Sequence, residues 1–312
     1  MRVLVLGGSG FLGRHVVAAL RERGHSAIVG SRRREPRRNP KATAGPECAW
    51  RIVRFERMTT PESWACTLRD IDVVVNCVGI MREWGSATFD CVQHRAPAAL
   101  AQACAGVAMR RLVHVSALGL DAAARSRFLQ SKILCEDAIR SAAVATTIVR
   151  PSLLDGEGGY GARWIRALAR LPVHAVPADA AGRMAVLDVR DAGEAIAVAC
   201  EDDAADHRDI ELGGSDLRTM REHLAALRRV HSQSPAWCVK IPPLLARIAS
   251  HLCDFLHLSP FSFGHLELLQ HDNVPAINAL PSLLGRAPRQ VGSPTPRTCA
   301  HRERLARSRL FQ

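Results

Sequence analysis

Residues 1–24 have the sequence MRVLVLGGSGFLGRHVVAALRERG. A short apolar run, Arg2–Leu6, is followed by a glycine-rich loop and then, from Phe11 to Glu22, by apolar residues at the spacing of a helix. A buried strand that turns directly into an amphipathic helix is typical of an α/β protein with a parallel sheet. We therefore expect this run to be the first strand of such a sheet rather than a signal peptide.

Three glycines of the loop, Gly7, Gly10 and Gly13, have the spacing GxxGxxG. The first permits a tight turn, the second lets the backbone approach a pyrophosphate, and the third lets the helix pack against the strand. The helix N-terminus would direct its free N–H groups at the phosphates. A plain tight turn is the alternative, but the strand before the loop and the helix after it favour a dinucleotide site.

The alternation of apolar runs with helix-period segments continues to about residue 150 and then loosens into shorter pieces punctuated by proline. It predicts an α/β fold, a Rossmann-type doubly wound parallel sheet with a smaller, mainly helical C-terminal lobe. The predicted organisation is a dinucleotide-binding domain at 1–150, a substrate-side lobe at 151–291 interleaved with it, and a basic, mobile tail at 292–312.

The chain of 312 residues has a formal net charge of +12, which alone would suit nucleic acid, anionic lipid or an anionic cofactor as a partner. Lysine occurs only at Lys41, Lys132 and Lys240, whereas arginine is abundant, and the basic runs are local, at 32–38 and 286–309. The sequence has no basic strand interleaved with aromatic residues and no known reader motif. We therefore expect no nucleic-acid partner.

The ten cysteines form no CxxC pair, and no His/Cys cluster has the spacing of zinc ligands. We expect reduced thiols, no metal site and a cytoplasmic location. No uncharged apolar stretch reaches the roughly 18 residues that a membrane span needs. The segment 241–269 is apolar enough to contact a membrane, a quinone or a protein partner, although helical core is the interpretation that we favour. A location at the inner face of a membrane, in contact with it from the cytoplasm, is therefore the alternative.

The end of the predicted second strand carries Ser31, Arg32 and Arg33. An NAD-specific site places Asp or Glu at this point, about 20 residues after the glycine loop, on the ribose 2′-hydroxyl. Arginine would instead pair with a 2′-phosphate through charge-assisted hydrogen bonds. A solvated basic loop is the alternative, and we prefer it from Arg34 onward. The sequence favours NADP(H) over NAD(H).

Further along the chain, an ordered series of segments follows the glycine loop. These are VVVNCVG at 73–79, HVSALG at 114–119, RFLQSK at 127–132, IVRPSLLDGEGG at 148–159 and VLDVRDAGEAI at 186–196. The series resembles the extended and atypical short-chain dehydrogenase/reductases, and in particular the branch that contains the Rossmann-type accessory subunit of respiratory complex I and bacterial nucleoside-diphosphate-sugar epimerase-like proteins. The resemblance covers residues 1 to about 285, and it is specific to the superfamily rather than to one reaction.

The resemblance implies cofactor contacts at matching positions of this chain. The pyrophosphate would be held by Gly7, Gly10, Phe11, Leu12 and Gly13. The adenine-ribose side would be approached by Cys77, Val78 and Gly79, and Pro151 would lie beside the nicotinamide.

The resemblance also implies a reaction centre, and one residue of it is missing. Ser116 matches the serine that hydrogen-bonds a substrate carbonyl or hydroxyl, and Lys132 matches the lysine that binds the nicotinamide ribose and lowers the pKa of a tyrosine four residues before it. That position is Phe128, and the single tyrosine of the chain is Tyr160. Loss of a general acid costs about 10²- to 10⁴-fold in rate. Ser116, Ser131 and Tyr160 are candidate replacements.

Two functions are compatible with these residues. The first is an NADP(H)-dependent oxidoreductase or epimerase-like enzyme that acts on a small or lipophilic substrate, held between Ser116, Tyr160 and the second lobe. The second is a binding protein of the same fold, in which the dinucleotide serves structure, assembly or redox sensing. Phe128 supports the second, whereas Ser116 and Lys132 support the first.

Overall fold

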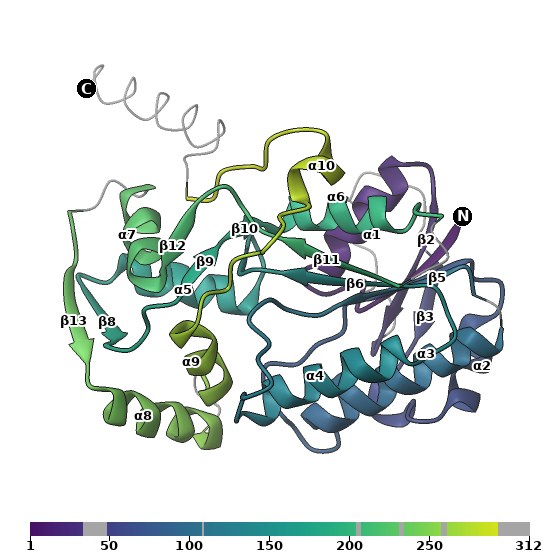
Figure 1. Ribbon diagram of the computed structural model, residues 1–312, viewed down its shortest axis with the longest axis horizontal. Coiled ribbons are helices and arrows are strands. Elements are labelled where there is room, and N and C mark those ends of the chain that lie inside the picture. Colours follow the sequence, from purple (N-terminus) through teal and green to yellow (C-terminus); the bar gives the residue numbers. More distant parts are fainter. Residues whose placement is uncertain (34–48, 108, 204–206, 231–233, 257–260, 293–312) are drawn as a thin grey trace, which may run out of the picture.

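The computed structural model describes residues 1–33, 49–107, 109–203, 207–230, 234–256 and 261–292 (Figure 1). Its centre is a seven-stranded parallel sheet in the order β11-β6-β5-β4-β1-β2-β3. The strands are β1 (Arg2–Leu6), β2 (Ser26–Ser31), β3 (Ala49–Ile52), β4 (Val73–Asn76), β5 (Arg111–Val115), β6 (Thr146–Pro151) and β11 (Arg208–Leu212). The strand order reverses between β1 and β4, which confirms the predicted doubly wound sheet.

Helices cover both faces of this sheet (Figure 1). One face carries α1 (Gly13–Glu22), α6 (Val189–Ala199) and α10 (Leu280–Leu284), and the other carries α2 (Ala65–Leu68), α3 (Ala96–Gly106) and α4 (Arg127–Arg140). In β1, Val3 and Val5 face the first set of helices, whereas Leu4 and Leu6 face the second. Because both faces are buried, the strand is a continuous apolar run without alternation.

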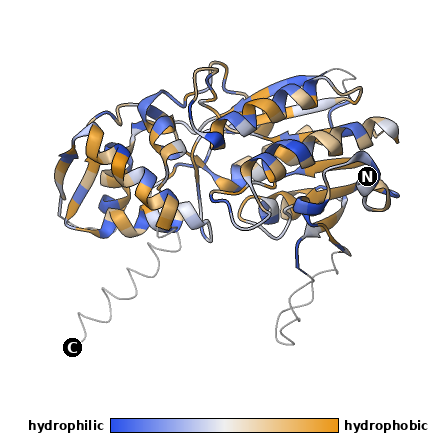
Figure 2. Ribbon diagram, turned by 90° about the horizontal axis from the view of Figure 1, so that it is seen from below, coloured by the Kyte–Doolittle hydropathy of each residue, from blue (hydrophilic) through white to orange (hydrophobic). Residues whose placement is uncertain are grey.

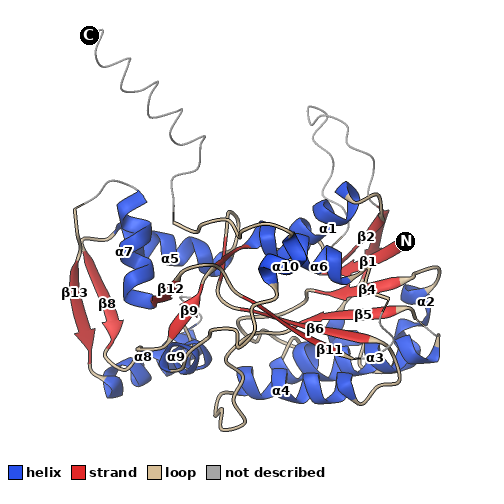
Figure 3. Cartoon of the chain, turned by 45° about the horizontal axis from the view of Figure 1, so that its top comes forward, coloured by secondary structure: helices blue, strands red, loops and turns tan. Residues whose placement is uncertain are grey.

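The smaller lobe lies beside the carboxyl ends of the central strands and contains both helices and strands (Figure 3). Its helices are α5 (Tyr160–Arg170), α7 (Met220–Val230), α8 (Pro243–Leu256) and α9 (Phe263–Gln270). Its strand pairs are β7 (Leu154–Asp155) with β10 (Leu187–Asp188), β9 (Arg183–Ala185) with β12 (Leu217–Thr219), and β8 (Val173–Pro177) with β13 (Trp237–Ile241). The predicted lobe is therefore mixed in structure rather than mainly helical.

The second half of the chain contributes to both parts of the molecule. Helix α6, strand β11 and helix α10 return to the main sheet, while the elements before α6 and those between β11 and α10 build the lobe. The domain boundaries at residues 150 and 291 stay a prediction. The predicted basic tail at 292–312 lies outside the described residues, apart from Gly292.

The exposure of helix α8 contradicts one expectation from the sequence. Of its residues only Ala246 and Ser250 are buried, so the interpretation of 241–269 as helical core is wrong for this helix. Helix α9, in contrast, buries Gly264 and Leu266. Within the described ranges, none of the helices combines the length and the hydropathy needed to cross a membrane.

Candidate functional site

The glycine loop folds back on the end of β1 in a way that only glycine permits. Gly7 has a φ of +73°, in the left-handed region, and its N–H donates to the carbonyl of Gly30 at 2.9 Å. The N–H of Gly10 donates to the carbonyl of Gly7 at 2.8 Å. A Cβ on Gly13 would overlap the carbonyl of Gly7, so the start of α1 lies directly against the loop.

The start of α1 is left open to an anion. Leu12 is the N-cap residue, its side chain makes no capping hydrogen bond, and the first turn has no acidic residue. The positive end of the helix dipole is therefore not neutralised by a neighbouring carboxylate within this turn. These features fit the diphosphate of a dinucleotide.

The segment after β4 lies against the glycine loop, at the point where the strand order reverses. A Cβ on Gly7 would lie 3.2 Å from the backbone of Cys77 and from the side chain of Val78. Burial raises the pKa of the Cys77 thiol to about 12, so this thiol is neutral and unreactive. Ligands of doubly wound sheets bind in the crevice at this reversal, so two of the predicted cofactor segments meet where the topology requires.

The end of β2 is joined to the glycine loop by a pair of hydroxyl groups. Ser9 Oγ and Ser31 Oγ lie 3.0 Å apart. The N–H of Arg33 donates to Ser31 Oγ at 3.4 Å, and both Arg32 and Arg33 are exposed. The two arginines therefore follow directly on the residue that contacts the loop.

Phe11 connects the glycine loop to the segment after β6. Its ring is so close to Gly159 that a Cβ on this glycine would lie 2.9 Å from it. The guanidinium of Arg14 lies 5.9 Å from the ring centroid and donates to the carbonyl of Glu157. Phe11 is therefore part of the contact between the two halves of the site, and its implied contact with the pyrophosphate stays a prediction.

Helix α4 carries the residues that the resemblance placed at the reaction centre. Phe128, Lys132 and Glu136 are spaced four residues apart, so they lie on one face of the helix. The Nζ of Lys132 lies 5.8 Å from the ring centroid of Phe128. Burial lowers the pKa of the Lys132 ammonium, and Cys135 and Glu136 partly offset this.

Glu136 fastens this helix to the edge of β6. The Nε of Arg150 donates to Glu136 Oε1 at 2.9 Å, and a guanidinium nitrogen of Arg140 donates to Oε2 at 2.8 Å. Burial alone would raise the pKa of the Glu136 carboxyl, but the hydrogen bonds, those of Arg150 first, hold it below its usual value. These ion pairs of Glu136 thus hold in place the turn of α4 that carries Lys132, four residues before Glu136.

Ser116 follows β5 and lies on the same side of the sheet as Glu136. Its N–H donates to the carbonyl of Val149 at 2.8 Å, which extends the pairing of β5 with β6. No described group lies at hydrogen-bond distance from its buried hydroxyl, which is nevertheless near enough to the Glu136 carboxyl to lower the pKa of that carboxyl. A buried hydroxyl without a partner is costly, so Ser116 is available to a ligand. Next to it, Pro151 accepts from Leu118 at 3.1 Å.

A series of hydrogen bonds that was not predicted from the sequence crosses the site from β4 to α4. Asn76 Oδ1 accepts from the N–H of Val78 at 3.1 Å, and Asn76 Nδ2 lies 3.1 Å from Nδ1 of His114. The other nitrogen of His114 lies 3.5 Å from Cys135 Sγ. Burial, with the charge of Lys132, lowers the pKa of His114 to about 3, so this ring is neutral.

Gly79 and Ser131 are joined through Gln93. A Cβ on Gly79 would lie 3.6 Å from Oε1 of Gln93, whose Nε2 donates to Ser131 Oγ at 3.3 Å. Gln93 lies in a π-helical turn, Cys91–Arg95, of the kind often found at functional sites. Ser131 also donates to the carbonyl of Phe128 at 3.0 Å, so its hydroxyl has two partners and is a poor replacement for the missing acid.

The ring of Phe128 is packed by its neighbours. Phe89 meets it edge-on at 5.5 Å, and the ring of His265 in α9 stacks on it at 5.4 Å. Tyr160, the other candidate acid, is 43% exposed at the start of α5. No contact places Tyr160 beside Ser116 among the described residues.

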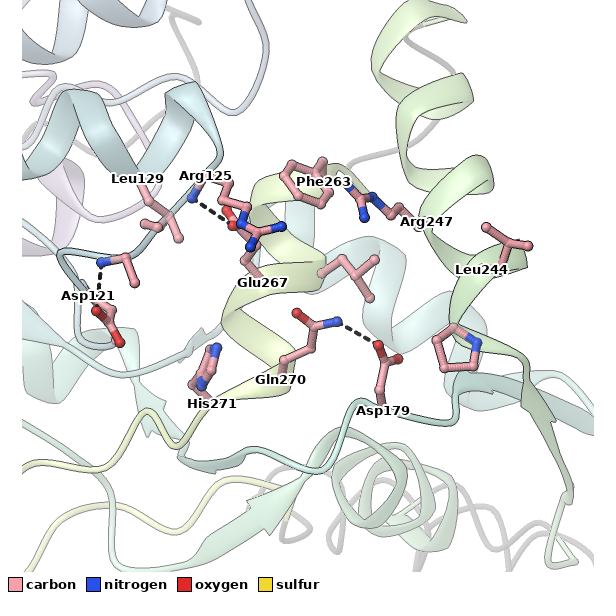
Figure 4. A pocket seen from close by; sticks show the side chains of 15 residues that line it. Asp121, Arg125, Leu129, Asp179, Leu244, Arg247, Phe263, Glu267, Gln270 and His271 are labelled. Atoms are coloured by element: carbon pink, nitrogen blue, oxygen red, sulfur yellow. Dashed lines mark hydrogen bonds between the residues drawn. The ribbon is translucent and has the colours of Figure 1, made fainter.

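A cavity of about 570 Å³ lies between the N-terminal end of α4 and helices α8 and α9 (Figure 4), and Phe89 and Phe128 line a second cavity of about 440 Å³. Leu129 lines the first cavity on one side, and Leu244 and Arg247 of α8 line it on the other.

Within the described parts of the chain, no group of three or more His, Cys, Asp or Glu side chains could hold a metal ion.

The sequence profile described as the NAD dependent epimerase/dehydratase family matches residues 3–213, which is more than half of the chain. The chain belongs to the NAD dependent epimerase/dehydratase family. NAD binding is typical of this family, and the glycine cradle of this chain fits it.

Two curated relatives confirm the predicted resemblance of this epimerase/dehydratase-family chain. It is 25% identical over 281 residues to NADH dehydrogenase (ubiquinone) 1 alpha subcomplex subunit 9, mitochondrial, of Arabidopsis thaliana, a match that covers 88% of this chain and 68% of the plant protein. It is 30% identical over 203 residues to the ceramide reductase of Caulobacter vibrioides, a match that covers 64% of this chain and 60% of the reductase. The chain thus spans less than two thirds of the reductase.

Solved structures show the same fold at lower identity. A short-chain dehydrogenase/reductase superfamily protein from Agrobacterium tumefaciens with bound NAD has a TM-score of 0.66 at 19% identity, with 99% of each chain covered. UDP-N-acetylglucosamine 4-epimerase from Bacillus cereus has a TM-score of 0.61 at 17% identity, with 86% of this chain and 99% of the epimerase covered. At these identities the likeness concerns the fold alone.

Several residues of this family member's site were missed by sequence reasoning. They are Asn76, Gln93, His114, Glu136 and Arg150. A signal existed for Glu136, which lies four residues after Lys132 and so shares its helix face. No such signal marked Arg150, because its pairing with Glu136 depends on how α4 packs against β6.

Proposed function

We propose that this chain is an NADP(H)-binding protein, and that it binds NADP(H) in preference to NAD(H). The observation that carries the preference is at the end of β2, where Ser31 contacts Ser9 of the glycine loop and Arg32 and Arg33 follow, both exposed. A carboxylate at that point would repel a 2′-phosphate, whereas guanidinium groups pair with it. The cytoplasmic location that we expect from the sequence is part of this proposal.

The residues of the reaction centre are better suited to binding a cofactor than to rapid catalysis. A bound NADPH would supply a hydride to a carbonyl carbon, and the carbonyl oxygen would then need a proton. Phe128 cannot donate one, and the neutral His114 is hydrogen-bonded within the protein. Lys132 and Ser116 remain to hold a ribose hydroxyl and a ligand oxygen. We propose that the bound dinucleotide has a structural, assembly or redox-sensing role.

Thermal unfolding with each dinucleotide tests the preference. A ligand present at 100 times its Kd stabilises the folded state by about 2.7 kcal/mol, so NADPH should raise the Tm at concentrations where NADH has little effect. The double variant Arg32→Ala/Arg33→Ala should lose the difference between the two cofactors and keep its response to NADH. Arg229→Ala, at an exposed arginine of α7, is the matched control. Equal shifts by NADH and NADPH in the natural chain would refute the preference.

A second candidate function is a slow NADP(H)-dependent oxidoreductase or epimerase-like enzyme with a lipophilic substrate. The unpaired, buried hydroxyl of Ser116 favours it, because in an active protein this group would bond to a substrate oxygen. The name of the Caulobacter relative is consistent with a lipid substrate. NADPH oxidation against a panel of long-chain ketones, quinones and sugar nucleotides tests it, and flat traces with every compound would exclude it in favour of the binding role.

A further inference from the structure

Helix α8 presents an apolar face to solvent. Six large side chains on it are between 45% and 80% exposed: Leu244, Leu245, Ile248, Leu252, Phe255 and Leu256. At 3.6 residues per turn they fall within about 120° of the helix circumference, and the buried residues Ala246 and Ser250 lie outside this arc. We call these six residues the α8 face. They form a continuous stripe rather than the scattered exposure that is normal on a surface.

The strands that precede α8 extend this apolar surface. Trp237 is 80% exposed, and it pairs in register with Val173 of β8, which is 45% exposed. Val239, two residues after Trp237 and hence on the same side of the sheet, is 50% exposed. Strand β13 ends at Ile241, two residues before α8 begins. Figure 2, which shows the molecule from the side on which α8 lies, has hydrophobic segments across this end of the lobe.

The part of the lobe that carries α8 has more basic than acidic residues. Residues 160–179 and 220–256, which build α5, β8, α7, β13 and α8, contain eight arginines and lysines and three acidic residues. One of the three acids, Asp254, is paired with Arg82, and of the eight cations Arg228 is buried and Arg166 is paired with Asp155. Lys240 lies before the apolar stripe in the sequence and Arg247 lies within it, and both are exposed. An apolar surface bordered by exposed cations is complementary to a layer of anionic headgroups above hydrocarbon.

We propose that the α8 face, with Trp237, docks this protein on the surface of an anionic lipid bilayer. Helix α8 would lie in the plane of the interface, with Ile248 and Phe255 among the acyl chains and with Trp237 at headgroup level, where tryptophan is enriched. A second copy of this chain fits less well, because a two-fold contact would bring two cationic borders together. The docking is independent of which dinucleotide the protein binds.

Docking on this face would bring lipid next to the cavity between α4 and α8. Leu244 belongs to the α8 face and also lines the cavity of about 570 Å³. The opposite side of this cavity is formed by Leu129, the neighbour of Phe128. Helix α8 is therefore shared between the docking surface and the cavity.

Sedimentation of the whole chain of 312 residues with vesicles tests the proposal. Vesicles of phosphatidylcholine alone are compared with vesicles in which about one third of the lipid is phosphatidylglycerol. We expect binding to the anionic vesicles, and a loss of about tenfold or more in partitioning for Ile248→Glu/Phe255→Glu, since each side chain contributes apolar burial. Ile277→Glu, at a residue that is 82% exposed elsewhere on the surface, is the matched control and should bind like the natural chain. Circular dichroism and the Tm confirm that each variant is folded.

A second measurement locates the contact. Lipids brominated near the headgroup should quench the tryptophan fluorescence of the bound protein, and Trp237→Phe should remove most of this quenching. Three results would overturn the proposal: no sedimentation with either vesicle, equal sedimentation of Ile248→Glu/Phe255→Glu and the natural chain, or a dimer in solution that this double variant converts to a monomer. The last result would assign the face to a second copy of the chain.

Discussion

The amide of Asn76 and the ring of His114 form a buried contact, with Asn76 Nδ2 and His114 Nδ1 3.1 Å apart. Because Asn76 Oδ1 accepts from Val78, the amide must donate to the ring, and the neutral imidazole then carries its proton on Nε2 and directs it at Cys135. The cofactor segment after β4 is thus joined to α4, one turn after Lys132. The uncharged state of His114 is a consequence of this burial.

Replacement of Asn76 by alanine should lower the stability of the fold. The change leaves Nδ1 of His114 and the N–H of Val78 without their partner, and an unsatisfied buried group costs about 1–3 kcal/mol. Urea unfolding measures this loss as a lower midpoint at an unchanged m-value. Gln130→Ala, at an exposed residue of α4, is the control and should change the midpoint little. An unchanged midpoint in Asn76→Ala would show that the contact carries no net stability.

Replacement of Gly13 by alanine should abolish dinucleotide binding. The added methyl group would overlap the carbonyl of Gly7, so α1 would have to move away from the loop that cradles the diphosphate. Gly106→Ala is the matched control, because a Cβ there meets nothing within 4 Å, and alanine in a helix is if anything stabilising. The Tm with and without NADPH separates the two variants. A cofactor response in Gly13→Ala equal to that of Gly106→Ala would contradict the assigned role of the loop.

The sheet and the glycine loop could be predicted from sequence because their signals are local. Arg2–Leu6 is apolar throughout, and the glycine spacing follows it directly, so propensity and topology agree in one short run. The surface position of α8 could not be predicted in this way. Its apolar stripe has the periodicity of a helix packed on a core, and only the arrangement of the lobe shows that no other described element covers it.

The pairing of Glu136 with Arg150 should make stability depend on acid pH. Because the folded protein lowers the pKa of Glu136 relative to the unfolded chain, its contribution is fully present above the unfolded value of about 4.3 and is lost as the pH falls through the folded value. Glu136→Gln should therefore destabilise by about 2 kcal/mol near pH 7, with the difference from the natural chain shrinking below pH 4.

The control for this pH dependence is an acid on the same helix. Asp137 is exposed, and its one ion pair among the described residues is with Arg140, at 3.5 Å. Asp137→Asn should therefore leave the loss of stability at acid pH unchanged. Chemical unfolding at a series of pH values compares the three proteins. A constant gap between Glu136→Gln and the natural chain from pH 7 to pH 3 would rule out the ionised pair as the cause.

The reaction centre was only partly accessible to sequence reasoning. The positions of Ser116, Phe128 and Lys132 followed from the motif, because a spacing of four residues places 128 and 132 on one helix face. The packing of Phe128 between Phe89 and His265 did not, because these rings come from segments far apart in the chain. The stack explains how a ring without a hydroxyl keeps a defined place at this position.

Restoring the tyrosine at position 128 should test whether the rest of the reaction centre is intact. Phe128→Tyr adds a phenol to a ring whose centroid is 5.8 Å from the Lys132 ammonium, and a nearby cation lowers a phenol pKa toward the operating pH. If Ser116 and Lys132 still hold a substrate, NADPH oxidation with a carbonyl substrate should rise by about 10²- to 10⁴-fold. Phe89→Tyr adds the same group to the neighbouring ring and should leave the rate at its background. Two results would contradict this prediction: a rise in the rate of NADPH oxidation in Phe89→Tyr as well as in Phe128→Tyr, or a rise that persists in Phe128→Tyr/Lys132→Met. Either would mean that the added phenol does not act together with Lys132.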